Sequence, residues 1–417
     1  MRHFIWGRRF EIGLTFGTLA LFEVAKKMVG PIGPDILGAA FVIALLTVPS
    51  LRSVISGRMI RNRLELRLQG VFWTCDVVGR SGALPAVKGI RTLPTGRVYL
   101  LELPTGLYLR SIEERLNELA VGLNVRTIRV TASRGTARYI ELTVIRSDAF
   151  GTPIVSPLLT CKQTSLWDPV AIGIGEDGQT VRIGLVEHNL LIGGEPGSGK
   201  SVALSSIVGA AALDPCASLV LLDGKEVELS AWRDVADRFV GSSQIEAIEA
   251  LEGLARLMNE RYQQLAKSRQ RKIRRNDVDG LVMVVIDELA LYLRAGDKTS
   301  RDRFAELLRD LVARGRAAGI IVVAATQKPS YEVVPTFIRD LFSYRLAMRC
   351  SSRDASDTIL GQGWAAQGFS ATSIDSADRG VGLLLAEGGL PVQILTINID
   401  DEQIDQLVSV AVRVRSQ

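Results

Sequence analysis

The most informative part of this 417-residue chain is GEPGSGKS, residues 194–201. It follows the apolar run NLLIG and precedes VALSSIVGAAAL, so we expect a strand before it and a helix after it. A glycine-rich loop between a strand and a helix is typical of a phosphate-binding loop. The alternative is a glycine-rich turn that merely enters a helix, and the full eight-residue pattern in this context favours the phosphate loop.

The residue types in this loop predict their roles. Glycines adopt the backbone dihedrals that let successive N–H groups point at a phosphate. Lys200 is expected to reach the β- and γ-phosphates of a nucleoside triphosphate, and Ser201 is expected to ligate Mg²⁺. The sequence therefore predicts ATP and Mg²⁺ as cofactors. The predicted nucleotide-binding residues are Gly194, Glu195, Pro196, Gly197, Ser198, Gly199, Lys200 and Ser201.

A pair of carboxylates follows the apolar run in LVMVVIDE, residues 281–288. The run predicts a buried strand, and ligands of open α/β sheets bind at the carboxyl ends of such strands. We expect Asp287 to hold Mg²⁺ through water and Glu288 to orient and polarise the attacking water. Alone, the acidic pair is equally compatible with a helix N-cap. Together with the phosphate loop it favours hydrolysis over phosphoryl transfer.

Another buried strand is predicted in GIIVVAATQKPS, residues 319–330, which carries Thr326 and Gln327 where the apolar run ends. A polar amide at a neighbouring strand tip can sense the γ-phosphate and pass that signal to the loop beyond. Gln327 is therefore the predicted sensor. A glutamine at such a position, taken alone, is more often an ordinary loop residue.

The basic excess of the chain lies near its N-terminus. Residues 1–70 contain ten Lys or Arg and four Asp or Glu, and the remaining 347 residues contain 40 and 41. Two apolar stretches, 12–22 and 36–51, are each shorter than the roughly 20 residues of a membrane span. Their basic flanks predict a hairpin with both ends in the cytoplasm. The alternative is a pair of buried or interfacial helices.

A small α/β domain is expected after this basic segment. Residues 98–104 predict a strand, Ser111 and Glu114 a capping box that begins a helix, and the runs around 127–133 and 138–146 a hairpin. No residue pattern there indicates catalysis, which favours a structural or assembly role. The predicted domains are a membrane anchor at 1–63, a small α/β domain at 64–148, a linker at 149–170 and a motor domain at 171–417.

The four cysteines are scattered, with no CxxC pair and no histidines near them. This spacing argues against a zinc site or a disulfide framework and fits a reduced, cytosolic compartment.

Six blocks around these motifs resemble the FtsK/SpoIIIE family of DNA translocases, in order and approximate spacing. The blocks are LLIGGEPGSGKS, VLLDGKEVELSAW, NERY, VVIDELALYL, RGRAAGIIVVAATQKPS and YRLAMRCSSRDASDTILG. The resemblance implies an α/β fold with a RecA-like P-loop motor domain that assembles as a homohexameric ring. It also implies hydrolysis of ATP between subunits while double-stranded DNA passes through the pore.

Carried over residue by residue, the resemblance assigns catalysis to Lys200, Glu288 and Gln327 and metal binding to Ser201 and Asp287. The segment at 64–148 resembles more weakly the module that precedes the motor in this family. Family members commonly act at the membrane, which implies a location at the cell membrane with the motor in the cytoplasm.

The chain also departs from the cell-division members of the family. It shows no long low-complexity linker, and after Gly361 we expect only one strand pair and a short tail, with no winged-helix domain. This compact form looks more like the transfer proteins of actinobacterial conjugative and integrative plasmids. The resemblance therefore favours double-stranded DNA transfer in conjugation.

Two sets of basic residues stay open. Ring motors use an arginine that reaches the nucleotide of the neighbouring subunit, and the candidates here are Arg314, Arg316, Arg345 and Arg349. The run KSRQRKIRR, residues 267–275, suits either contact with DNA phosphates or a solvated helix end.

Two rival functions also remain. One is an ATPase that pumps single-stranded DNA or protein, and the other is a non-motor protein whose assembly ATP controls. A metabolic kinase is disfavoured, because no motif for activating an acceptor is visible.

Overall fold

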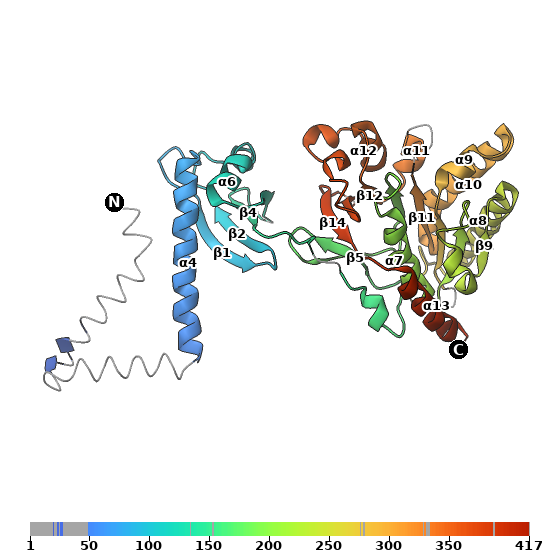
Figure 1. Cartoon of the computed structure of the whole chain (residues 1–417), viewed down its shortest axis with the longest axis horizontal. Helices are drawn as coiled ribbons and strands as arrows, with labels where there is room; N and C mark the ends of the chain where they lie inside the picture. The colour runs from blue at the N-terminus through green and yellow to red at the C-terminus, as the bar shows by residue number, and fades with distance from the viewer. Residues whose placement is uncertain are drawn as a thin grey trace. The chain divides into compact units, whose positions relative to one another are not determined.

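The computed structural model describes residues 20, 23–24, 26–27 and 49–416, except 134, 152–153, 276, 278–279, 328, 331–333 and 387. The chain forms two units, Met1–Asp148 and Ala149–Gln417, which we call unit 1 and unit 2 (Figure 1). The two apolar stretches of the predicted anchor, 12–22 and 36–51, lie almost entirely outside the described residues. Within the described ranges, no helix has the length and apolar character needed to cross a membrane.

Unit 1 is built on a four-stranded antiparallel sheet with the strand order β1-β2-β4-β3. Alternate residues of the strands point into one apolar core, which includes Leu101, Ile140 and Leu142, and Ile112 and Leu119 from the helices join it. The elements are α4 (Pro49–Thr74), β1 (Ala86–Thr92), β2 (Gly96–Glu102), α5 (Leu109–Glu113), α6 (Leu116–Leu123), β3 (Thr127–Ala132) and β4 (Tyr139–Ile145).

Two sequence-based expectations for unit 1 need correction. The boundary set at residue 63 falls inside α4, a continuous helix whose Leu68 and Phe72 belong to the core of unit 1. The predicted capping box is wrong, because Ser111 lies within α5 and the chain turns at Glu114 before α6 begins. The helix starts earlier than the polar pattern suggests, because Leu107 and Leu109 already pack against the core.

Unit 2 contains a ten-stranded sheet with the order β6-β5-β14-β13-β12-β7-β11-β10-β8-β9. The strands from β12 to β9 in this order are parallel, and the four from β6 to β13 are antiparallel to their neighbours. The strands are β5 (Val170–Gly175), β6 (Thr180–Ile183), β7 (Leu190–Gly193), β8 (Ser218–Leu222), β9 (Arg238–Val240), β10 (Val282–Ile286), β11 (Ile320–Thr326), β12 (Tyr344–Met348), β13 (Val381–Leu385) and β14 (Val392–Thr396).

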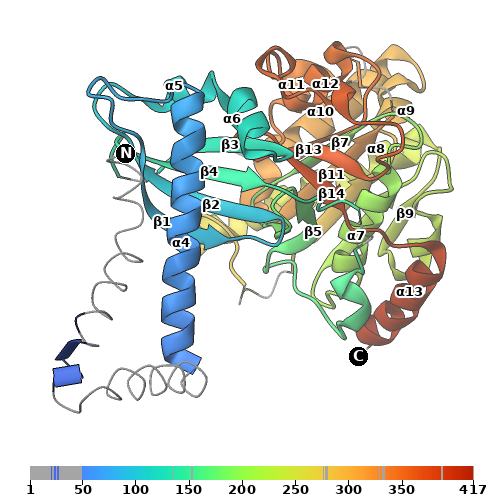
Figure 2. The ribbon, with the colours of Figure 1, turned by 60° about the vertical axis from the view of Figure 1, so that its left-hand side comes forward.

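Helices cover both faces of this sheet. Figure 2 shows β5, β14 and β13 side by side within unit 2. The α-helices are α7 (Lys200–Ala212), α8 (Gln244–Lys267), α9 (Leu289–Arg294), α10 (Lys298–Arg314), α11 (Thr336–Arg339), α12 (Arg353–Leu360) and α13 (Asp401–Arg415). The 3₁₀ turns are Pro157–Thr160, Ser230–Val235, Gly315–Ala318, Ala365–Gln367 and Ala371–Ser373.

The central strands are apolar along their whole length because both of their faces are buried. In β10, Met283 and Val285 belong to the cluster that includes α7 and α13, whereas Val284 and Ile286 belong to the cluster that includes α8, α10 and α12. This two-sided burial leaves the strand ends as the places where polar side chains can gather.

Residues at both ends of unit 2 contribute more structure than the sequence suggests. In the predicted linker 149–170, Leu158 and Leu166 are buried in the core of unit 2, and the Leu166 N–H donates to Asp214 Oδ2 at 2.7 Å. The predicted short tail contains α13, which starts with a capping box between Asp400 and Gln403. Ile404 and Leu407 of this helix are buried.

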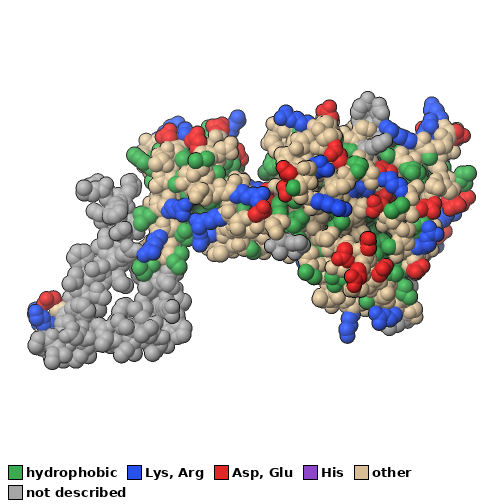
Figure 3. All heavy atoms as spheres, viewed as in Figure 1, with side chains coloured by type: hydrophobic (Ala, Val, Ile, Leu, Met, Phe, Trp, Pro, Cys, Tyr) green, Lys and Arg blue, Asp and Glu red, His purple; other side chains and the backbone are tan. Residues whose placement is uncertain are grey.

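The two units differ in charge. Unit 1 contains 21 Lys or Arg and 11 Asp or Glu, whereas unit 2 contains 29 and 34. Figure 3 shows Lys and Arg side chains across the middle of the visible face of unit 1, while carboxylates gather over the lower part of unit 2. The basic excess therefore belongs to the whole of unit 1 and not only to residues 1–70.

Candidate active site

The phosphate-binding loop connects β7 to α7. Gly197 and Gly199 have φ values of +78° and +103°, a region that residues with a side chain adopt at a cost. A Cβ on Gly199 would lie 2.7 Å from the backbone of Gly380, whose N–H donates to the carbonyl of Ser198 at 2.9 Å. Both the local conformation and the packing against Gly380 thus require glycine at position 199.

Lys200 and Asp287 form a buried ion pair beneath this loop. Lys200 Nζ lies 3.0 Å from Asp287 Oδ1, and the two side chains are 3% and 0% exposed. The second carboxylate oxygen, Asp287 Oδ2, is buried and has no hydrogen-bond partner among the described residues. A buried, unpartnered carboxylate oxygen suits a cation. Ser201 lies in the first turn of α7, so these residues fit a Mg²⁺ site formed by Ser201 and Asp287.

Glu288 lies beside Asp287 and is held from the neighbouring strand. Its Oε1 accepts a hydrogen bond from Thr326 Oγ1 at 2.9 Å, and its Oε2 accepts one from the Gln327 N–H at 3.1 Å. The strand register explains these contacts, because Ile286 of β10 pairs with Ala324 of β11, and Glu288 and Thr326 each lie two residues beyond this pair. The structure therefore brings Gln327 to Glu288 through its backbone N–H.

Lys225 also approaches Glu288, with Nζ 3.6 Å from Oε2. Neither Lys225 nor Thr326 is assigned a role by the sequence analysis. The signal for Lys225 was present in the block VLLDGKEVELSAW, since parallel strands that end together bring the residues after them to the same edge.

A cavity of about 530 Å³ opens beside the phosphate loop. It is lined by Gly199 and Val202 from the loop and α7, and by residues around β13 and β14 such as Arg379 and Thr396. Its volume and its position next to the loop suit the base and sugar of a nucleotide.

Comparison with known proteins now identifies the domain. Residues 159–282 match the FtsK/SpoIIIE family. This segment, which contains the phosphate-binding loop, is therefore similar to the FtsK/SpoIIIE family. The sequence-based resemblance to this family is confirmed.

The curated relatives are DNA translocases named FtsK. The chain is 25% identical over 392 residues to that of Corynebacterium efficiens, which covers 87% of this chain and 40% of the relative. It is 26% identical over 392 residues to that of Mycobacterium tuberculosis, and this match covers 87% of this chain and 46% of the relative. The chain therefore spans less than half the length of these relatives.

A similar fold occurs in the pCW3 conjugation coupling protein TcpA, solved with ATPγS. That structure has a TM-score of 0.52 and 19% identity and covers 83% of this chain and 99% of TcpA. A second structure, EssC ATPases 2 and 3 from Geobacillus thermodenitrificans, has a TM-score of 0.52 and 14% identity. It covers 63% of this chain and 51% of the EssC chain. At these identities the likeness shows the fold alone.

The four candidate arginines of unit 2 lie in three places. Arg349 Nη1 is 3.8 Å from Glu195 Oε2, beside the phosphate loop of its own chain. Arg314 donates to Asp310 and to Asn259 on the surface of the helices. The choice among the four as the residue that reaches a neighbouring subunit stays a prediction.

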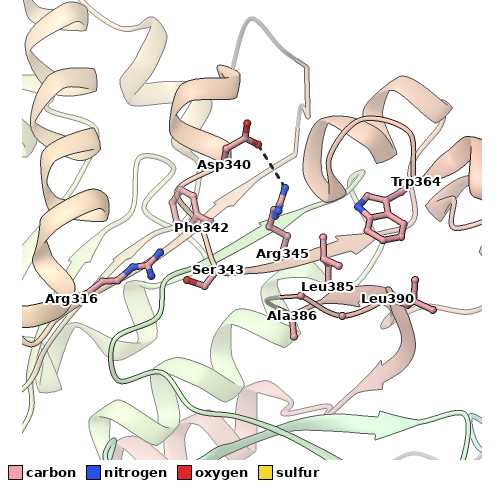
Figure 4. A pocket seen from close by; sticks show the side chains of 11 residues that line it. Arg316, Asp340, Phe342, Ser343, Arg345, Trp364, Leu385, Ala386 and Leu390 are labelled. Carbon is pink, nitrogen blue, oxygen red and sulfur yellow. Dashed lines mark ion pairs between the residues drawn. The ribbon is translucent and has the colours of Figure 1, made fainter. Parts of the chain in front are cut away.

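Arg316 and Arg345 line one cavity of about 490 Å³, shown in Figure 4. Arg345 forms an ion pair with Asp340 at 3.8 Å, and burial lowers the pKa of its guanidinium. Because Arg345 pairs in register with Leu191 near the start of β7, this cavity lies at the sheet edge opposite to the phosphate loop.

The basic run 267–275 is partly engaged within unit 2. Both guanidinium nitrogens of Arg275 donate to the Asp168 carboxylate at 2.9 Å, and Lys272 pairs with Glu187. Ile273 is buried between them. These contacts favour a structural role for Lys272 and Arg275 over contact with DNA.

Proposed function

We propose that this protein is an ATPase that moves double-stranded DNA. The observation that carries the proposal is the meeting of Lys200, Asp287 and Glu288 at one edge of the parallel sheet. The match of residues 159–282, which include Lys200, to the FtsK/SpoIIIE family supports it. The similarity to DNA translocases named FtsK supports DNA as the substrate.

In this proposal each residue of the site has its own role in ATP hydrolysis. The backbone N–H groups of the loop and the Lys200 ammonium bind the phosphates and neutralise the charge that develops on them. Glu288 accepts a proton from the attacking water at a carboxylate oxygen, and Thr326 and Gln327 orient that carboxylate. When bound by Ser201 and Asp287, Mg²⁺ supplies positive charge to the phosphate oxygens.

The finer parts of the proposal concern assembly and location. We propose a homohexamer at the cell membrane with a cytoplasmic motor, in which one of the four candidate arginines completes the neighbouring nucleotide site. The match to the FtsK/SpoIIIE family supports the ring, and the similarity to a protein named as a conjugation coupling protein is the reason for proposing a role in plasmid transfer. The basic character of unit 1 suits a module close to DNA or to anionic lipid.

The test is ATP hydrolysis by the purified full-length chain, alone, with duplex DNA and with single-stranded DNA. We expect stimulation by duplex DNA that is lost in Lys200→Ala. Stimulation by single strands alone would instead indicate a single-strand pump. Hydrolysis that neither DNA changes would leave a protein pump or an assembly switch, and the proposal would be wrong.

A further inference from the structure

Lys225 reaches the active site from a loop whose shape is fixed by a buried carboxylate. Asp223 follows β8 and is fully buried. Its Oδ1 accepts the N–H of Lys225 at 3.2 Å and its Oδ2 accepts the N–H of Leu229 at 2.8 Å. Two backbone hydrogen bonds to the Asp223 side chain therefore hold the segment 223–229, which we call the Lys225 loop. Because β8 neighbours β10, the loop lies next to the acidic pair.

The Glu288 carboxylate is surrounded by donors on two sides. From β11 it receives the Thr326 hydroxyl and the Gln327 N–H, and from the Lys225 loop it receives an ammonium group at 3.6 Å. Glu288 is only 8% exposed, whereas Lys225 is 36% exposed. The lysine thus connects a buried carboxylate to the surface of the domain.

This arrangement opposes water activation. A carboxylate that accepts a proton from water needs an oxygen that faces the water. Here Thr326 donates to Glu288 Oε1, the Gln327 N–H donates to Oε2, and the Lys225 ammonium lies 3.6 Å from Oε2. The neighbouring ion pair, Lys200 with Asp287, would exchange its partners if phosphates bound Lys200 and Mg²⁺ bound Asp287. The contact between Lys225 and Glu288 involves neither of these two residues.

We infer that Lys225 is a positioning residue that holds Glu288 away from the attacking water until the Lys225 loop moves. The inference rests on the proposed ATPase function and adds a contact that limits the rate of hydrolysis by restraining Glu288. The outer part of the loop is accessible, since Val227 is 68% exposed. A macromolecule that contacts the loop could therefore draw Lys225 away and release Glu288.

The experiment compares Lys225→Met with Lys225→Arg in the full-length protein, with duplex DNA present or absent. Methionine keeps the length of the side chain and removes its charge, whereas arginine keeps the charge. We expect Lys225→Met to raise the DNA-independent kcat by about two- to fivefold, the range of a partly exposed ion pair, with KM for ATP unchanged. The DNA-stimulated rate should stay the same, so the stimulation ratio falls. Lys225→Arg should behave as the parent.

Arg233→Met is the matched control. The Arg233 guanidinium lies 3.9 Å from the carboxylate of Glu226 in the Lys225 loop and does not contact Glu288. The basal rate of this variant should therefore equal that of the parent. Binding of a fluorescent ATP analogue checks that each variant keeps its nucleotide site, and Lys225→Gln replaces Lys225→Met if that protein fails to fold.

The outcomes separate this inference from the proposed function. If the parent hydrolyses ATP and the neutral variant has an equal or lower basal kcat, the restraint is wrong and the ATPase proposal stands. If the parent does not hydrolyse ATP under any condition, both fail.

Discussion

The two units bury very different side chains. Among the described residues, Thr95 is the only polar or charged side chain that unit 1 buries, whereas unit 2 buries Lys200, Asp223, Asp287 and Glu288. Buried charges cost free energy unless they are paired, so a fold retains them where they serve a purpose. The buried charges of the described residues therefore lie in unit 2, where the candidate active site is.

Among substitutions of the buried charges of unit 2, Glu288→Gln is expected to have the largest effect on ATP hydrolysis. Glu288→Gln keeps the size of the side chain and removes its ability to accept a proton. We expect ATP hydrolysis to fall by about 10²–10⁴-fold while ATP binding is retained. Phosphate release and binding of a fluorescent analogue measure the two. Glu226→Gln, an exposed carboxylate on the Lys225 loop, is the control and should lose far less activity.

The buried ion pair gives the next largest effect. Lys200→Met leaves the fully buried Asp287 carboxylate without its cation, and we expect unit 2 to lose about 3–5 kcal/mol of unfolding free energy. The double variant Lys200→Met/Asp287→Leu should recover most of this loss, because two apolar groups replace the pair. Urea unfolding measures both proteins. Equal stability of the single variant and the parent would show that the pair is not desolvated.

In unit 1 the sensitive positions are apolar. Leu142 is fully buried in the core, so Leu142→Ala should cost unit 1 about 2–5 kcal/mol. Because unit 2 has its own core, its hydrolysis of ATP without DNA should be unchanged. A melting curve with an earlier unit 1 transition, together with a phosphate-release assay, checks both parts. A loss of basal hydrolysis would show that the two units depend on each other.

The smallest effect concerns a surface charge cluster of unit 1. Glu102 pairs with Lys88 at 2.6 Å and with Arg138 at 2.9 Å, and the hydrogen bond from Lys88 lowers the pKa of Glu102 below its usual value of 4.5. A lowered folded-state pKa means that the stability from this group is present above pH 4.5 and is lost as the pH falls through the folded pKa. Glu102→Gln should therefore flatten the acid side of the unit 1 stability curve slightly, and salt should reduce the difference.

Sequence patterns predicted the parts of the fold that follow from local chemistry. The runs before Gly194, Asp287 and Gln327 are the parallel strands β7, β10 and β11, and their register brings these motifs to one edge. The roles assigned to the site residues stay predictions that the experiments above test.

Other features of the structure depend on packing between residues that are far apart in the sequence. The helix start before Ser111 was missed because Leu107 and Leu109 pack into the core, a contact that polar capping patterns do not report. Helix α13 did have a sequence signal, since the capping box of Asp400 and Gln403 precedes Ile404, Leu407 and Ala411 at helical spacing. The distance of Lys225 from Glu288 depends on the pairing of β8 with β10, so the position of Lys225 after an apolar run indicates this contact only once the strand order is known.

The contact between Gly199 and Gly380 has a mechanical consequence. The Gly380 N–H donates to Ser198 of the phosphate loop, and its carbonyl accepts the Thr396 N–H and hydroxyl from the end of β14. With no side chain at either glycine, the two backbones touch without a compressible layer between them. A displacement of the phosphate loop would therefore bear directly on the β13–β14 hairpin, and a side chain added at either glycine would force the two backbones apart.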